Sequence, residues 1–281
     1  MGKYRRILVA VDGSAASLHA LKASFSLSPY GITAAAVIPP YGGDLRLVGV
    51  QNIRKLLQDP YEQALAAAQE LADQGGAPLK TVLATGEPHE EIVDLADVDN
   101  CDLVILGTKA PELVDQVLLS SMAARVIGYS RQDVLIMPEG KPLGWQKLLL
   151  PLDGSRYSKV ATEKALDLAL SYDGELLFMT ATDLPAATYG LAPGIADDLI
   201  IKLKGFLKKI TERASALGLK AEGLVRYGEA PQAVAEVARE RQVNLIIMGS
   251  HGRTGLRRLL MGSVTEKVIS LAPCPVLVVK H

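Results

Sequence analysis

The sequence predicts two tandem α/β domains, each a doubly wound open sheet of parallel strands with helices on both faces. Three observations predict this fold class. Short runs of Val, Ile and Leu alternate with amphipathic segments of roughly 10–20 residues, a pattern typical of β-α-β units. The length of 281 residues accommodates two ordinary domains, and the chain repeats itself. Right-handed crossovers between parallel strands then place helices on both faces of each sheet.

The internal repeat has an offset of about 141–142 residues. Residues 6–14 read Arg-Ile-Leu-Val-Ala-Val-Asp-Gly-Ser, and residues 147–155 read Lys-Leu-Leu-Leu-Pro-Leu-Asp-Gly-Ser. Three later segments return in the same register: Gly86-Glu87 as Gly228-Glu229, residues 103–108 as 245–250, and residues 134–137 as 276–279. Four matches in one register indicate two homologous domains, which we place at residues 1–143 and 144–281 around a Pro/Gly turn.

The second repeat displays the expected elements in chain order. Its apolar, β-rich runs predict strands at residues 147–152, 175–180, 220–227, 245–248 and 276–279. The amphipathic stretches between them predict helices at residues 158–171, 195–217, 230–241 and 263–270. Irregular segments follow the second strand of each repeat, at residues 39–52 and 183–194, and are long enough to cover or regulate a site.

A glycine-rich segment follows the fourth strand of the second repeat. Gly249, Gly252 and Gly262 precede Ser263, between a buried strand and a helix. This arrangement aims backbone N–H groups at a phosphate, and any Cβ there would hold the anion away from the backbone. Asp153 follows the first strand, so it and the glycines can border one crevice where the strand order reverses. The segment therefore predicts nucleotide binding.

These features together resemble the universal stress protein family. The resemblance rests on Gly-x2-Gly-x9-Gly-Ser after the fourth strand, on the Asp after the first strand, and on the tandem arrangement. It implies a five-stranded Rossmann-like domain and a stress-response regulatory protein that binds ATP or a related adenine nucleotide. It also implies pairing of two domains through their last strands. A tandem chain can satisfy that pairing internally as a pseudo-dimer, and a homodimer remains open.

The same resemblance implies a set of binding residues, matched position by position. The ribose would contact Asp153, with Pro151 beside it, and adenine would face the backbone near Ala181. The phosphates and ribose would be held by Gly249, Ser250, Gly252, Arg253, Gly262, Ser263 and Val264.

The first repeat departs from this pattern. Gly107 matches Gly249, but Ala110 stands where Gly252 would be and Ser120 where Gly262 would be. Pro111 enters the loop and removes one N–H donor.

Charge separates the two repeats as well. Acidic Glu112 and Asp115 flank the first loop, whereas the second loop carries three arginines, at positions 253, 257 and 258. Residues 1–143 hold 12 Lys and Arg against 17 Asp and Glu, and the remainder hold 18 against 14. We therefore expect one strong nucleotide site per chain, in the C-terminal domain.

Some of these residues also have a purely structural explanation. Asp12 keeps the place of Asp153 in the first repeat, so a turn or capping role is open for both. Ser121 likewise corresponds to Ser263, and serine is a common helix N-cap. His251 has no evident catalytic partner, and we treat it as a loop residue.

Two other functional classes remain open. An ATPase or adenylate-forming enzyme on a related fold is the alternative, but no general base and no Walker lysine accompany the glycines. We therefore assign no catalytic residue and expect slow hydrolysis at most. A scaffold with two vestigial sites is the third class, and the intact glycines weigh against it. Mg²⁺ would be held through the phosphates, since no carboxylate cluster is evident. The sequence does not identify a protein partner.

Composition excludes further classes. A net charge of −1 and an aromatic content of 5% argue against nucleic-acid binding. No apolar run approaches the ~18 residues of a membrane span. The two cysteines lack metal or redox spacing, which suggests a reducing compartment, so we expect a cytoplasmic protein.

Overall fold

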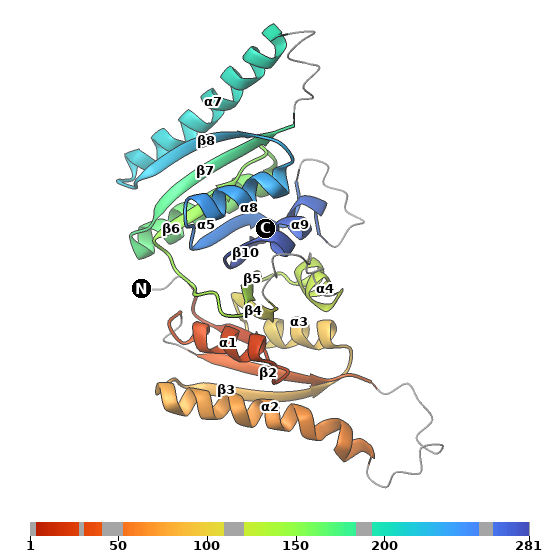
Figure 1. The fold of residues 1–281 in the computed structure, drawn as a ribbon. Coiled ribbons are helices and arrows are strands. Elements are labelled where there is room, and N and C mark those ends of the chain that lie inside the picture. Colours follow the sequence, from red (N-terminus) through yellow and green to blue (C-terminus); the bar gives the residue numbers. More distant parts are fainter. Residues whose placement is uncertain are drawn as a thin grey trace. The chain divides into compact units, whose positions relative to one another are not determined.

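The computed structural model describes residues 4–27, 31–40, 53–109, 121–183, 193–252 and 261–280. The chain divides into two compact units, one holding the described residues up to Gly140 and the other those from Lys141 onward (Figure 1). Each unit has parallel strands packed with helices, so the predicted doubly wound α/β fold is confirmed. We keep residues 1–143 and 144–281 as the proposed domain bounds.

The first unit contains five strands and four helices among its described residues. Its strands lie in the order β3-β2-β1-β4-β5, and every neighbouring pair is parallel. In chain order its elements are β1 (Ile7–Ala10), α1 (Ala15–Ser24), β2 (Ile32–Ile38), α2 (Ile53–Gly75), β3 (Leu79–Thr85), α3 (Pro88–Val98), β4 (Leu103–Thr108), α4 (Ser121–Tyr129) and β5 (Asp133–Pro138).

The second unit repeats this plan with the parallel order β8-β7-β6-β9-β10. Each element predicted for this repeat is present, with ends that differ from the prediction by two residues at most. In chain order the elements are β6 (Lys147–Pro151), α5 (Arg156–Tyr172), β7 (Glu175–Thr182), α7 (Pro193–Ala216), β8 (Ala221–Tyr227), α8 (Ala230–Glu240), β9 (Leu245–Gly249), α9 (Ser263–Leu271) and β10 (Val276–Val279).

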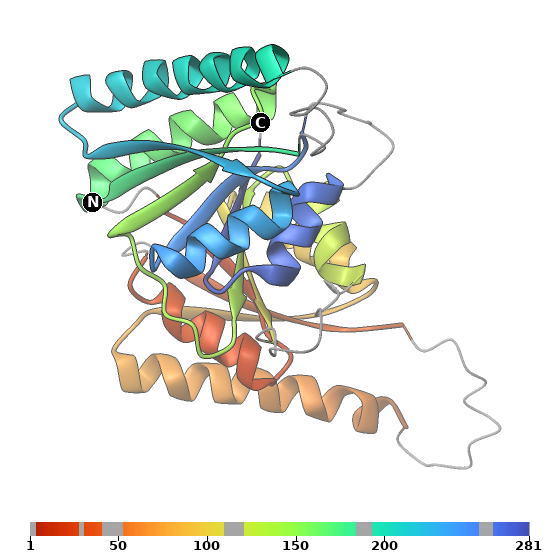
Figure 2. The ribbon, with the colours of Figure 1, turned by 45° about the horizontal axis from the view of Figure 1, so that its top comes forward.

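The central strands form the core of each unit. The β9 and β10 strands consist almost entirely of Leu, Ile, Met and Val, and all their residues are buried. Continuous apolar strands of this kind are typical of parallel sheets that helices cover on both faces. In the second unit α5 and α7 lie on one face of the sheet and α8 and α9 on the other (Figure 2). Strand order reverses between β6 and β9, which places a crevice at their carboxyl ends.

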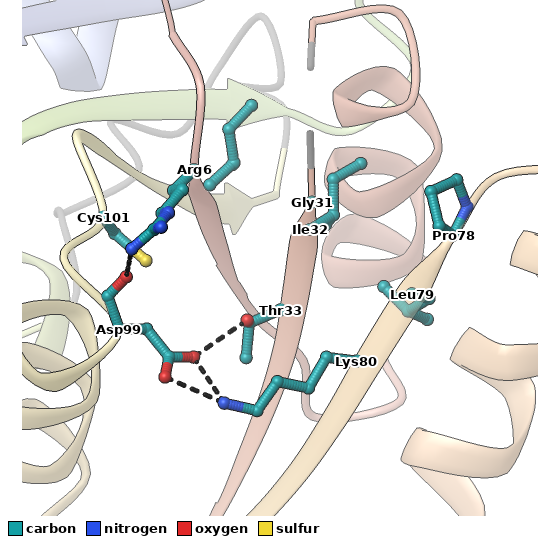
Figure 3. A pocket seen from close by; sticks show the side chains of 10 residues that line it. Arg6, Gly31, Ile32, Thr33, Pro78, Leu79, Lys80, Asp99 and Cys101 are labelled. Atoms are coloured by element: carbon teal, nitrogen blue, oxygen red, sulfur yellow. Dashed lines mark hydrogen bonds and ion pairs between the residues drawn. The ribbon is translucent and has the colours of Figure 1, made fainter. Parts of the chain in front are cut away.

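The opposite, amino-terminal edge of each sheet carries an ion pair whose charges are exchanged between the repeats. In the first unit Lys80 Nζ lies 2.8 Å from Asp99 Oδ2, and Thr33 Oγ1 donates to the same oxygen at 3.1 Å (Figure 3). The Lys80 hydrogen bond is the largest influence on Asp99 and lowers the pKa of that carboxyl. The equivalent pair of the second unit, 142 residues later, is Glu222 with Arg241. Both pairs join the edge strand to the turn before the fourth strand.

Inverting this pair is expected to be tolerated better than breaking it. Lys80→Glu places two carboxylates together and should lower the free energy of unfolding by about 1 kcal/mol or less, since the lysine is largely exposed. The double variant Lys80→Glu with Asp99→Arg copies the second repeat and should recover most of this loss. The effect is expected near pH 7 and should fade as the pH falls below about 4, because the folded pKa of Asp99 is depressed. Urea unfolding of Lys80→Glu, of Asp99→Arg and of the double variant measures the coupling between the two residues. A loss of stability in the double variant equal to the sum of the two single losses would contradict it.

Both cysteines are buried. Burial raises the pKa of the Cys101 thiol to about 11 and that of Cys274 to about 12. Neither thiol is therefore activated as a nucleophile at neutral pH. Separately, none of the helices in the described ranges is long and apolar enough to span a membrane.

Candidate functional site

A cavity of about 500 Å³ lies at the carboxyl ends of β6, β7 and β9 in the second unit. Ser250, although predicted to bind, does not line it: this residue is buried, and its backbone carbonyl accepts a hydrogen bond from Gly262 N at 2.9 Å. Arg253 lies outside the described residues, as do residues 257 and 258 and most of the segment expected at 183–194. The other predicted binding residues all line the cavity: Pro151, Asp153, Ala181, Gly249, Gly252, Gly262, Ser263 and Val264.

Asp153 is positioned by a tight turn between β6 and α5. Its Oδ1 accepts a hydrogen bond from Ser155 N at 2.9 Å, and Ser155 caps α5 by accepting from Ser158 N at 3.1 Å. Gly154 has a φ of +78°, which glycine adopts without strain. The turn therefore holds one carboxylate oxygen in place.

The first repeat builds the same turn around Asp12. Ser14 N donates to Asp12 Oδ1 at 3.0 Å, and Ser14 caps α1. Burial alone would raise the pKa of Asp12, but hydrogen bonds from Ser14 and Ser17 hold it below the ordinary value. The turn role considered for this aspartate is thus present in both units, and in the second unit the other oxygen, Asp153 Oδ2, lies on the side of Gly252.

Gly252 lies against that second oxygen. A Cβ added at Gly252 would be 2.9 Å from Asp153 Oδ2. A Cβ added at Gly262 would be 3.2 Å from the Cα of His251. The absence of side chains therefore lets the backbone at Gly252 lie close to Asp153 and the backbone at Gly262 lie close to His251.

The helix α9 begins at this loop without a side-chain cap. Its N-cap is Gly262, which has no side chain to accept a hydrogen bond, whereas α1 and α5 are capped by serines. Ser263, considered as a cap from the sequence, is instead the first residue of the helix. Thr265 Oγ1 donates to the Gly249 carbonyl at 3.0 Å and so joins the first turn to the end of β9. An uncapped helix N-terminus carries partial positive charge and N–H donors suited to an anion.

Gly249 is required by the packing of α5 against the end of β9. A Cβ there would lie 2.7 Å from Tyr157 Cβ and 2.9 Å from the Tyr157 carbonyl oxygen. Gly107 occupies the same place in the first unit, against the carbonyl of Ala16 and 2.7 Å from Ser17 N. This glycine is needed in both repeats because the end of the fourth strand passes directly beneath the first helix.

The apolar walls of the cavity were not foreseen from the sequence. Leu199 and Leu203 come from α7, and Ala230 and Val234 come from α8. Each pair is spaced i, i+4 and so faces one side of its helix. That spacing was visible in the sequence, but it could not distinguish a cavity wall from ordinary core. Thr180 at the end of β7 adds a polar group, whose Oγ1 donates to the Leu152 carbonyl at 3.0 Å.

His251 also lines the cavity. Its ring centroid lies 5.2 Å from that of Tyr157, and its Nδ1 lies 3.1 Å from Ser250 Oγ. Arg156 packs on the same tyrosine ring, with its Cζ 4.7 Å from the Tyr157 ring centroid. These contacts hold the loop against the start of α5, which agrees with the loop role assigned to the histidine.

The corresponding turn of the first unit is covered by α2. A Cβ added at Gly13 would lie 3.3 Å from Ala64 Cβ of α2, and this helix also contacts α1. Phe206 is the residue of α7 equivalent to Ala64 when the repeats are aligned on Gly76 and Gly218. Correspondingly, α2 packs mainly against β2, whereas α7 packs mainly against the edge strand β8. The small side chain of Ala64 thus lets α2 cover the Asp12 turn of the first unit. The equivalent Asp153 turn of the second unit borders the cavity.

Carboxylates are scarce around the cavity. Asp153 is the one acidic side chain among its described lining residues. Within the described part of the chain, no group of three or more His, Cys, Asp or Glu is placed to hold a metal ion.

Comparison with known proteins identifies the family. The model of the universal stress protein family matches residues 3–138 and again residues 144–280. The chain belongs to the universal stress protein family. Each repeat is one copy of the family's domain, as the resemblance in the sequence indicated.

Individual universal stress proteins agree with this assignment. One from Mycolicibacterium smegmatis is 25% identical over 293 aligned residues, covering 98% of this chain and 96% of that protein. One from Methanocaldococcus jannaschii is 36% identical over 141 residues, covering 48% of this chain and 82% of that protein. The crystal structure of a universal stress protein from Archaeoglobus fulgidus has the same fold, with a TM-score of 0.74, 21% identity and coverage of 100% of this chain and 97% of that one.

Proposed function

We propose that the second repeat binds an adenine nucleotide, ATP in the first instance, and that the protein acts as a stress-response regulator with one nucleotide site per chain. The observation that carries the proposal is the cavity at the carboxyl ends of β6, β7 and β9, closed on one side by the uncapped N-terminus of α9. Its volume of about 500 Å³ lies within the range of small-molecule sites.

The residues present fit such a ligand. The phosphates would lie at Gly252, Gly262 and Ser263, where any Cβ on the glycines would intrude and where the first turn of α9 directs its N–H groups. The ribose would meet Asp153, and the base would enter between Ala181 and the apolar side chains of α7 and α8. Arg253 would add positive charge at the phosphates.

Mg²⁺, when bound, would be held through the nucleotide phosphates and would neutralise part of their charge. Asp153 is held by its turn, and it is the one described carboxylate beside the cavity. The proposal therefore assigns binding residues and no catalytic residue. It leaves slow hydrolysis as an outcome for phosphate-release assays to measure.

Titration of the full chain with Mg-ATP at neutral pH is expected to give one site per chain. The reason is that α2 packs onto the Asp12 turn of the first unit, and the loop there carries Ala110 and Ser120 in place of glycines. Isothermal titration calorimetry measures the stoichiometry directly. Two equivalent sites would contradict the assignment to the second repeat alone, and absence of binding would contradict the proposed function.

A further inference from the structure

Each unit has an edge strand that is paired on one side only. Among the described strands β8 pairs with β7 alone, and β3 pairs with β2 alone. Strands at the edge of a sheet present a row of free N–H and C=O groups that can pair with another chain.

The edge at β8 has an open groove beneath α7. Figure 1 shows α7 running along β8, and the groove between them has a volume of about 770 Å³. Its floor includes Leu207 and Gly223, and a Cβ added at Gly223 would lie 3.0 Å from Leu207 Cβ. The glycine therefore lets the helix lie close over the edge strand while the flank of the groove stays open.

The rim of this groove is basic. Lys204 and Lys208 line it, and both are exposed on α7. Glu212 is the one acidic residue among the described lining residues, and its Oε1 lies 3.7 Å from Lys208 Nζ. The groove thus offers an excess of positive charge beside the edge strand.

The corresponding edge of the first unit is acidic. Glu62 and Asp73 are exposed on α2 at the positions equivalent to Lys204 and Ser215, and Ala66 replaces Lys208. The glycine position of β8 is occupied by Thr81 in β3. The helices that flank the two edge strands therefore carry opposite charge at these positions.

The charged residues of the edge strands do not block these edges. Charged side chains on edge strands commonly prevent strand addition. Gly223 faces α7, so the neighbouring Glu222 points to the other face of the sheet, where it pairs with Arg241. Lys80 of β3 is likewise paired with Asp99, and Arg226 of β8 with Glu240. These three charges are therefore held by partners within their own units.

We propose that a second copy of this chain docks here, with the β3–α2 edge of one copy against the β8–α7 edge of another. Right-handed crossovers place α2 and α7 on equivalent faces of their sheets. Rotating one copy by half a turn about the sheet normal then sets β3 antiparallel to β8 and brings the acidic α2 beside the basic α7. Contacts between two α7 edges or two α2 edges would oppose like charges. The proposal uses no residue of the nucleotide cavity and goes beyond the proposed function.

The first test is the mass of the full chain in solution without nucleotide. At about 50 mM salt, sedimentation or light scattering should show the average mass rising from the 29.9 kDa of one chain to at least about twice that value as concentration increases to several hundred micromolar. At about 0.5 M salt the mass should return toward one chain, because screening weakens the attraction between exposed charges. A constant mass of one chain at low salt would overturn the proposal.

The second test exchanges the charges. Lys204→Glu with Lys208→Glu makes both edges acidic, and Glu62→Lys with Asp73→Lys makes both basic, so each double variant alone should remain a single chain. An equimolar mixture should associate again, since each variant then meets an edge of opposite charge. Trp145 fluorescence checks that both variants are folded in the second unit. Association of either variant at the wild-type level, or failure of the mixture to associate, would overturn the interface.

Discussion

Gly252→Val is expected to weaken the binding of Mg-ATP by at least about 30-fold, or about 2 kcal/mol. The first added carbon alone would lie 2.9 Å from Asp153 Oδ2, and valine adds two methyl groups beyond it. The side chain would therefore displace the carboxylate assigned to the ribose or occupy the space assigned to the phosphates. Calorimetric titration of the variant beside the wild type measures the change.

A matched control separates this effect from a general effect of valine. Gly205 lies in α7, is exposed, and has no atom within 4 Å of the place where its Cβ would stand. Gly205→Val should leave ATP affinity unchanged. The fold of Gly252→Val is checked by unfolding followed through Trp145, the one tryptophan of the chain, which stacks on Tyr172 with ring centroids 4.3 Å apart. Binding of ATP by folded Gly252→Val at wild-type affinity would refute the assignment of the phosphate loop.

The fold and the position of the candidate site could be predicted because both follow from local patterns. Apolar runs and amphipathic stretches define the strands and helices of the second repeat to within two residues, and the β-α-β order restricts the sheet to parallel pairing. Asp153 follows β6 and Gly249 ends β9, and these two strands lie on either side of the reversal in strand order. Topology alone therefore brings them to one crevice.

Other features could not be predicted because they depend on how helices pack over the sheet. The walls formed by Leu199 and Val234 require knowing how far α7 and α8 stand from the strands. The covering of the Asp12 turn depends on Ala64, a residue without distinctive chemistry, where the second repeat has Phe206. Such differences of side-chain volume decide tertiary packing without changing any local pattern.

The glycines of the loop also divide into what the sequence pattern predicts and what the packing of helices decides. The sequence interpretation treated Gly249, Gly252 and Gly262 alike, as a cradle for phosphate. Contacts in the structure explain Gly249 by helix packing, which accounts for its retention as Gly107 in the first repeat. Gly252 and Gly262 have no counterpart glycine there, and they are the two that lie beside the proposed ligand.

Gly249→Ala is accordingly expected to destabilise the second unit by about 1–3 kcal/mol, as overpacking of a tight core does. The added methyl group would meet both the side chain and the backbone of Tyr157, at 2.7 Å and 2.9 Å. Backbone atoms of α5 cannot rotate away, so either the helix or the end of β9 must shift. Urea unfolding followed by Trp145 fluorescence measures the loss.

Gly205→Ala is the control for this substitution, because it adds the same methyl group to an open helical position. It should stabilise α7 by about 0.5–1 kcal/mol, the usual gain when alanine replaces glycine in an exposed helix. Gly107→Ala should destabilise the first unit in the same way, read by circular dichroism, while the unfolding reported by Trp145 changes less. If Gly249→Ala unfolds like the wild type yet loses ATP binding, this glycine serves the ligand and not the packing of β9 beneath α5.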